Sequence, residues 1–162
     1  MTTTDMQLKP IGTVQAADFG FRLQIEAPYR PALQGLAGFS HANVLWWSHL
    51  VEGEADRQQL TVGRLFRQAP EELGVFATRF PKRPNPLALS VVKVLAIDLE
   101  QGVVDVPAID AEEGTPIVDL KPYMPVVDRV REVQVPAWCD HWPEWYEDFA
   151  EFDWSEEMVP AG

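Results

Sequence analysis

Short stretches in which apolar and polar residues alternate recur along most of the chain. Such alternation is typical of β-strands with one buried face, and the 14 prolines and 10 glycines among 162 residues favour tight turns over long helices. A hairpin turn is expected at Glu100–Gly102 and a single helical turn at Tyr29–Gly35. The pattern predicts strands over residues 8–15, 20–26, 41–50, 73–79, 87–100, 102–109 and 115–123.

The last part of the chain has a different pattern. Its aromatic residues recur at helical spacing, which predicts an amphipathic helix that begins near Pro143. The stripe consists of Trp138, Trp142, Trp145, Tyr146 and Phe149. Many short strands with few helices predict an all-β fold, either a β-barrel or a sandwich. We therefore expect one compact domain over residues 1–137, followed by a short helical, Trp-rich extension over residues 138–162.

Acidic charge is concentrated in this predicted extension. The chain has 25 acidic and 13 basic residues, and its net charge of −12 at first argues against a nucleic-acid partner. Eight of the acidic residues lie between Asp140 and Glu157, where there is no Lys or Arg, so the rest of the chain is only mildly acidic. Charge alone therefore does not exclude RNA as a partner.

Two further observations bear on the compartment. No apolar run has the length of a membrane span, and residues 1–10 lack the basic and apolar blocks of a secretory signal. Cys139 is the single cysteine, which excludes an internal disulfide and a Cys-rich zinc site. These features predict a cytoplasmic protein with neither a membrane partner nor a metal.

The most unusual segment, Gly74–Ser90, carries an apolar strand into a loop of three prolines, three cations and an asparagine. The cations are Arg79, Lys82 and Arg83. Proline restricts its own backbone and that of the preceding residue, so such a loop loses little entropy when it binds a ligand. A stiff cationic loop suits a carboxylate or a phosphate, although it is also compatible with a surface turn whose cations are solvated.

Histidine and carboxylate residues form two more groups. In one strand, His41 and His49 would share a face at a separation of roughly 26 Å, too far apart to bind one metal ion. Asp119, Lys121 and Tyr123 would likewise share a strand face, either as a simple ion pair beside a tyrosine or as the wall of a pocket. An acidic turn, Asp110–Glu113, precedes them. No dinucleotide-binding, P-loop or metalloprotease motif is present in the sequence.

Together these blocks resemble the TsaA-like family of tRNA methyltransferases. The family patterns read approximately IGxIxSP, GLxxFSHxWxLxxFH, GVFATRSPxRPNPIGLS and DLxDGTPVLDIKPYxPxxD. The matching residues are 11–14, 35–41, His49, Gly74–Ser90 and 110–128, so the resemblance covers about residues 8–128. The sequence departs from the patterns at Asn43, Ser48 and Ala88, and it resembles the short form, without the C-terminal domain of longer bacterial members.

The resemblance implies a compact β-barrel, a homodimer and S-adenosylmethionine as the methyl donor. It also implies methylation of threonylcarbamoyl-adenosine in the tRNA anticodon loop. The donor-binding positions fall on Ser48, His49, Arg79, Leu89, Asp110, Ala111, Glu112 and Glu113. Arg79 would then pair with the methionine carboxylate, since charge-assisted bidentate pairs of this kind are strong.

The remaining motif residues receive catalytic or acceptor-binding roles. The candidates for catalysis are His41, His49, Asp119 and Tyr123, because a weakly nucleophilic urea-like nitrogen needs a base or a polarising group. The candidates for acceptor binding are Lys82, Arg83, Asn85 and Lys121. Two alternatives stay open at this point: the same transfer to an acceptor other than tRNA, and a non-catalytic module that binds S-adenosylmethionine.

Overall fold

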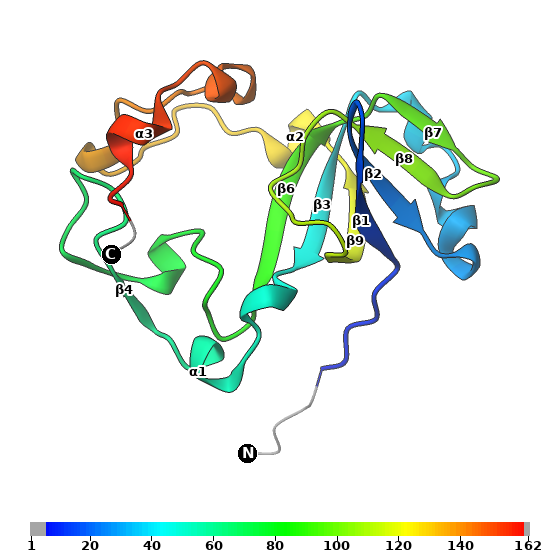
Figure 1. The fold of residues 1–162 in the computed structure, drawn as a ribbon. Coiled ribbons are helices and arrows are strands. Elements are labelled where there is room, and N and C mark those ends of the chain that lie inside the picture. Colours follow the sequence, from blue (N-terminus) through cyan, green and yellow to red (C-terminus); the bar gives the residue numbers. More distant parts are fainter. Residues whose placement is uncertain (1–5, 161–162) are drawn as a thin grey trace.

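The computed structural model describes residues 6–160, and most of their regular structure is one antiparallel sheet (Figure 1). Its strand order is β6-β3-β9-β1-β2-β8-β7. The strands are β1 (Gly12–Ala17), β2 (Gly20–Ile25), β3 (His41–Trp47), β6 (Leu87–Lys93), β7 (Ala96–Asp98), β8 (Val103–Val106) and β9 (Pro116–Pro122). A second sheet pairs β4 (Thr61–Gly63) with β5 (Glu72–Gly74). The predicted β-rich fold is confirmed.

The helical segments are all short. They are η1 (Ala27–Leu33), η2 (Leu36–Gly38), η3 (His49–Val51), α1 (Glu54–Arg57), η4 (Val75–Ala77), α2 (Pro125–Asp128), η5 (Ala137–Cys139), η6 (Tyr146–Ala150) and α3 (Trp154–Glu157). The first of them, η1, corresponds to the helical turn expected near Tyr29. The strand predicted over 73–79 ends at Gly74, and η4 follows it directly.

The prediction of a closed barrel is wrong for the part of the chain that the structure describes. The edge strands of the sheet are β6 and β7, and no strand pairing joins them across residues 6–160. They are nevertheless close, because only Val94 and Leu95 separate them along the chain and two linking residues span at most about 10 Å. The N–H groups of these residues donate to the carbonyls of Ser40 and Asp105, at 2.9 and 2.8 Å. The sheet is therefore strongly curved, and the strand predicted over 87–100 is two strands that meet at a bend.

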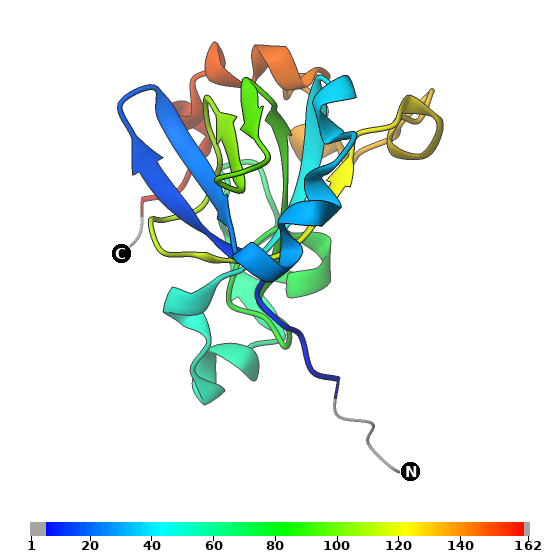
Figure 2. The ribbon, with the colours of Figure 1, turned by 90° about the vertical axis from the view of Figure 1, so that its right-hand side faces the viewer.

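The hairpin expected at Glu100–Gly102 is confirmed, since β7 and β8 pair on either side of it. Gly102 has a φ of +68°, a conformation that favours glycine, and a Cβ there would lie 2.6 Å from the carbonyl oxygen of Ile25. Figure 2 shows this hairpin beside the β1–β2 hairpin, and β2 pairs with β8 in the sheet.

The core consists largely of aliphatic strand residues, many of them at alternate positions. Val14, Leu23, Val44 and Ile117 have no exposed surface, and Ile25 has 1%. Each fully buried side chain of this size contributes about 1.5–3 kcal/mol of transfer free energy. This core fixes the strands whose ends carry the candidate site.

The C-terminal extension is not the continuous amphipathic helix that the spacing of its aromatic residues predicts. It contains three short elements, η5, η6 and α3, and Trp145 is extended with φ −117° and ψ 144°. Pro143 disfavours helical backbone at Trp142, which opposes a continuous helix across this position. The aromatic side chains pack in separate places, because Trp142 lies 4.6 Å from the ring of Phe66 whereas Tyr146 lies 5.7 Å from the ring of His41.

Candidate functional site

A cavity of about 560 Å³ lies where four segments meet at one end of β3. This volume is within the range of about 300–1,000 Å³ that is usual for small-molecule sites. Residues from the β3–η3 junction, the proline loop, the start of β6 and the turn before β9 line it. They are Trp46, Ser48–Val51, Arg79–Pro81, Arg83, Leu87–Ser90, Asp110–Glu112 and Thr115.

Cations of the proline loop differ in how much of their charge remains available. Arg83 donates to the carbonyls of Val75 and Thr78 at 2.9 and 3.4 Å, so it holds the loop together. Arg79 donates one Nη1 hydrogen bond to the carbonyl of Leu89 at 3.1 Å and is exposed. A guanidinium has five N–H groups, so Arg79 retains donors for an anionic ligand.

Carboxylates from a second segment also line the cavity. Asp110 and Glu112 lie in the turn that precedes β9, and neither has a salt-bridge partner among residues 6–160. The cavity therefore combines a guanidinium that has no salt-bridge partner among residues 6–160 with carboxylates from another part of the chain. This combination suits a ligand that has both an anionic group and amino or hydroxyl groups.

Ser48 is the strongest sign that the cavity binds a polar ligand. It is 7% exposed, and its hydroxyl is the one buried side-chain polar atom without a hydrogen-bond partner in the part of the chain that the structure describes. Its backbone is fixed, because its N–H donates to the carbonyl of Pro86 at 2.8 Å. A buried hydroxyl without a hydrogen-bond partner costs free energy, so a ligand whose oxygen or nitrogen formed a hydrogen bond with the Ser48 hydroxyl would gain affinity.

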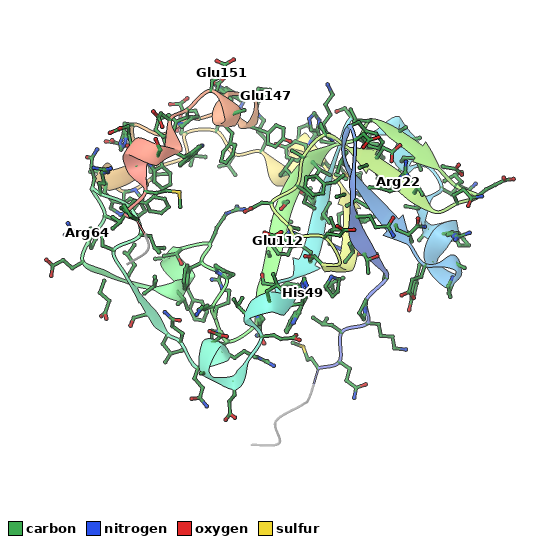
Figure 3. All side chains as sticks on the ribbon, in the orientation of Figure 1. Arg22, His49, Arg64, Glu112, Glu147 and Glu151 are labelled. Atoms are coloured by element: carbon green, nitrogen blue, oxygen red, sulfur yellow. The ribbon has the colours of Figure 1, made fainter. Side chains whose placement is uncertain are left out.

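His49 is half-buried at the start of η3 and is labelled in Figure 3. Its Nδ1 lies 3.4 Å from the hydroxyl oxygen of Thr115. The expectation that His41 and His49 share one strand is wrong, because β3 ends at Trp47 and the chain turns at Ser48. Only His49 lines the cavity.

Four other predicted site residues lie along the sheet, outside the cavity lining. His41 is at the far end of β3, about 20 Å of strand from Trp47. Its ring centroid is 6.4 Å from that of Tyr123, whose N–H donates to the His41 carbonyl. Asp119 and Lys121 form an exposed ion pair of 2.7 Å, and the hydrogen bond to Asp119 raises the pKa of Lys121. Catalytic or acceptor-binding roles for these residues stay predictions.

Three further predicted residues also lie outside the cavity lining. Lys82 forms an ion pair of 3.0 Å with Asp56, which neutralises much of its charge. Asn85 accepts a hydrogen bond of 3.5 Å from Arg57. Glu113 is an exposed neighbour of the lining residue Glu112. Of the predicted donor-binding residues, the structure brings together Ser48, His49, Arg79, Leu89, Asp110, Ala111 and Glu112.

Several lining residues were not predicted to belong to a site. Thr115 belongs to the Gly114–Pro116 stretch of a family pattern, and Trp46 and Phe80 lie within two residues of predicted site residues. Proximity to a motif was therefore the only signal in the sequence. Trp46 donates from Nε1 to the hydroxyl of Ser90 at 2.9 Å, and this hydrogen bond joins two lining residues of β3 and β6.

Neither a metal site nor a membrane-spanning helix is found in residues 6–160. No group of three or more His, Cys, Asp or Glu side chains is arranged to hold a metal ion there. No helix in the same range has the length and apolarity needed to cross a bilayer.

Comparisons with known proteins identify the family. Residues 3–129 match the family model described as the tRNA-methyltransferase O N-terminal domain. The chain belongs to this family. The resemblance drawn from the sequence motifs is thereby confirmed, and residues 130–162 lie beyond the matched part.

Relatives from archaea and bacteria share this domain. An S-adenosyl-L-methionine-binding protein of Archaeoglobus fulgidus is 34% identical over 146 residues, which cover 80% of this chain and 97% of the relative. The tRNA (adenine(37)-N6)-methyltransferase of Escherichia coli is 36% identical over 112 residues, which cover 67% of this chain and 47% of that enzyme. The chain therefore spans about half the length of this methyltransferase.

A solved structure gives the same result for the fold. TrmO from Pseudomonas aeruginosa superimposes with a TM-score of 0.61 at 27% identity, over 81% of this chain and 62% of that one. Members of the family are thus named both as S-adenosylmethionine-binding proteins and as methyltransferases, which agrees with the donor and the enzyme class that the motifs predict.

Proposed function

We propose that this chain is an S-adenosylmethionine-dependent N-methyltransferase whose acceptor is the N6 nitrogen of threonylcarbamoyl-adenosine in the tRNA anticodon loop. The observation that carries the proposal is the cavity at the end of β3, where a guanidinium with unused hydrogen-bond donors, two carboxylates and an unpaired buried hydroxyl meet. The name of the E. coli relative gives adenine 37 of tRNA as its acceptor, which supports the acceptor class.

The polar groups of the cavity match the functional groups of the donor. S-adenosylmethionine supplies a methyl group activated by attachment to a sulfonium. Arg79 would bind the carboxylate of the methionine part, and Asp110 and Glu112 would accept hydrogen bonds from its ammonium group or from the ribose hydroxyls. Ser48 would gain the hydrogen-bond partner that it lacks. The apolar side chains of Trp46 and Leu89 would contact the rest of the ligand.

Positioning accounts for the chemical step in this proposal. A bond forms between the acceptor nitrogen and the methyl carbon of S-adenosylmethionine, while the bond between that carbon and the sulfonium sulfur breaks. The nitrogen then loses a proton to solvent or to a side chain. Holding the nitrogen in line with the breaking bond lowers the entropic part of the barrier. The residues that bind the donor lie on strand ends and on a proline-stiffened loop, and such elements maintain the alignment.

Titration with S-adenosylmethionine tests the donor, and nucleoside analysis tests the acceptor. Isothermal calorimetry should give a Kd in the micromolar range or tighter, and the absence of both heat and a melting shift at millimolar donor would remove the enzymatic proposal. Mass spectrometry of tRNA from a strain that lacks this protein should show loss of methylated threonylcarbamoyl-adenosine, and re-expression should restore it. Persistence of the methylated nucleoside would remove the proposed acceptor.

A non-catalytic donor-binding module is the second candidate. The A. fulgidus relative matches over nearly its whole length and is named only as an S-adenosyl-L-methionine-binding protein. Tight donor binding together with unchanged tRNA modification would favour this candidate. We further propose a homodimer in the cytoplasm, where tRNA is available, and sedimentation at micromolar concentration tests the dimer.

A further inference from the structure

We propose that Thr115 is a positioning residue for His49: it holds the imidazole in the tautomer that carries its hydrogen on Nε2. His49 then acts as a hydrogen-bond donor toward a ligand oxygen in the cavity rather than as a general base. The Nε2–H group of His49 would recognise a carboxylate or a ribose hydroxyl of the ligand. The inference about the tautomer stands on the free protein, and only its consequence for donor binding rests on the proposed function.

Thr115 is held rigidly by backbone hydrogen bonds on both sides of its side chain. Its N–H donates to the carbonyl of Glu112 at 3.1 Å, and its carbonyl accepts from the N–H of Val14 at 2.9 Å. The preceding residue, Gly114, has a φ of +81° and donates to the carbonyl of Val14 at 2.8 Å. Val14 belongs to β1 and has no exposed surface, so the turn is clamped to the core of the sheet.

The hydroxyl of Thr115 has one hydrogen-bond partner among residues 6–160. Thr115 is 1% exposed, and its Oγ1 lies 3.4 Å from Nδ1 of His49. A buried hydroxyl needs an acceptor for its hydrogen, and a neutral imidazole offers one only at a nitrogen without hydrogen. Donation from Thr115 therefore leaves Nδ1 bare and places the imidazole hydrogen on Nε2.

The other ring nitrogen is free to meet a ligand. No hydrogen bond to Nε2 of His49 is present within the described range, and His49 lines the cavity. An Nε2–H group donates and cannot accept a proton, so this tautomer excludes proton abstraction through Nε2. The structure thus narrows the predicted catalytic role of His49 to binding and orientation.

The orientation of His49 depends on Thr115, because the contact with Thr115 is the one hydrogen bond of the His49 ring among residues 6–160. Valine has the size of threonine without its hydroxyl, so Thr115→Val removes the hydrogen bond with little change in packing. Thr115→Ser keeps the hydroxyl and serves as the matched variant.

Nitrogen-detected NMR of ¹⁵N-histidine-labelled full chain tests the proposal directly. At about pH 8.5, where an ordinary imidazole is neutral, the His49 signals should show hydrogen on Nε2 in the wild type and in Thr115→Ser. Thr115→Val should give a mixture of both tautomers. Hydrogen on Nδ1 in the wild type would overturn the proposal, and so would a Thr115→Val spectrum identical to that of the wild type. The wild-type spectrum alone can refute the proposal, so the test remains valid even if Thr115→Val does not fold.

Donor affinity gives an independent reading of the same contact. S-adenosylmethionine should bind Thr115→Val about three- to tenfold more weakly, the effect of one ordinary hydrogen bond, and should bind Thr115→Ser as it binds the wild type. Equal affinity of wild type and Thr115→Val would overturn the predicted contact between His49 and the donor. Absence of binding to the wild type itself would instead contradict the proposed function and leave the NMR result unaffected.

Discussion

The cavity at the end of β3 and the C-terminal extension are built in different ways. The cavity is held by backbone hydrogen bonds, since Ser48 and Thr115 are each tied through the main chain to another segment. The extension is held largely by side chains, with Phe66, Trp138 and Trp142 in mutual ring contact at centroid separations of 4.6 to 5.9 Å. Within residues 138–160, backbone hydrogen bonds to a distant segment are made by Glu157, which accepts from Arg67, and by Val159, which donates to Leu65.

This difference indicates separate roles for the two regions. A network of backbone hydrogen bonds fixes the geometry of polar groups closely, as ligand recognition requires, and it depends little on side-chain identity. Aromatic contacts supply area and tolerate a loosely ordered backbone. Exposed carboxylates such as Glu147 and Glu151 cover the outer side of the extension (Figure 3). We therefore expect substitutions in one region to leave the other almost unchanged.

The largest expected effect is on donor binding in Arg79→Ala. Loss of a charge-assisted pair with a carboxylate should weaken S-adenosylmethionine binding more than tenfold, as measured by calorimetry. Lys82→Ala is the matched control, because Lys82 is three residues away, pairs with Asp56 and does not line the cavity. It should change donor affinity less than twofold. An intact affinity in Arg79→Ala would show that the carboxylate binds elsewhere.

The next largest effect is expected in the extension after Phe66→Ala. Burial raises the pKa of the Cys139 thiol, and Cys139 is 8% exposed, so it should react slowly with a thiol reagent. Removal of the Phe66 ring should loosen the packing of Trp138 and Trp142, so that Cys139 is accessible in a larger fraction of molecules. A tenfold rise in that fraction would increase the rate at which Cys139 reacts with the reagent about tenfold. Phe76→Ala is the control, because Phe76 is 82% exposed. Donor affinity should stay at its wild-type value, and a parallel loss would contradict the independence of the two regions.

A smaller effect is expected on the packing of the extension when Glu157 is protonated at acid pH. His141 Nε2 lies 2.7 Å from Oε1 of Glu157, and this hydrogen bond lowers the pKa of the Glu157 carboxyl below its usual 4.5. A depressed pKa in the folded state stabilises the protein above the unfolded pKa, and this stabilisation is lost as pH falls through the folded pKa. The extension should therefore loosen as pH falls from about 4.5, as followed by tryptophan fluorescence.

Glu157→Gln separates this effect from general acid denaturation. Glutamine is neutral at every pH and resembles the protonated carboxyl, so the variant should already show the looser packing between pH 6 and pH 8, and its fluorescence change below about pH 4.5 should shrink. The Trp142 indole also donates to Glu157, at 3.3 Å, so a tryptophan that reports on this site lies in direct contact with it. Identical acid transitions in both proteins would mean that Glu157 does not govern the packing of the extension.

Local rules account for most of the sheet and fail where tertiary contacts decide. The sequence pattern located β2 and β9 almost to the residue, and in β2 the alternation matches the burial of Leu23 and Ile25. The break between β6 and β7 was missed, because no proline or glycine marks Val94 and Leu95. The helical spacing of the aromatic residues in the extension was misleading, because their rings do not pack on one surface. Trp142 packs against Phe66, whereas Tyr146 packs against His41.

The candidate site was predicted in part for the same reason. Residues within sequence blocks, such as Arg79 and Asp110, were recognised because the motif is contiguous. Thr115 was missed because its importance arises from a contact with His49, which is 66 residues away in the sequence. Arg83 illustrates the converse, since a cation in the motif proves to be occupied by the carbonyls of its own loop.

The smallest expected effect is on the exposed pair of Asp119 and Lys121. The side chains are 44% and 61% exposed, and exposed ion pairs contribute little to stability. Lys121→Ala should therefore leave the melting temperature and the affinity for S-adenosylmethionine unchanged. If Lys121 binds the acceptor tRNA through a phosphate, the same variant should weaken tRNA binding, and the salt dependence of binding should become shallower by about one charge. Filter binding at several salt concentrations measures this slope, and an unchanged slope would remove Lys121 from the RNA-binding surface.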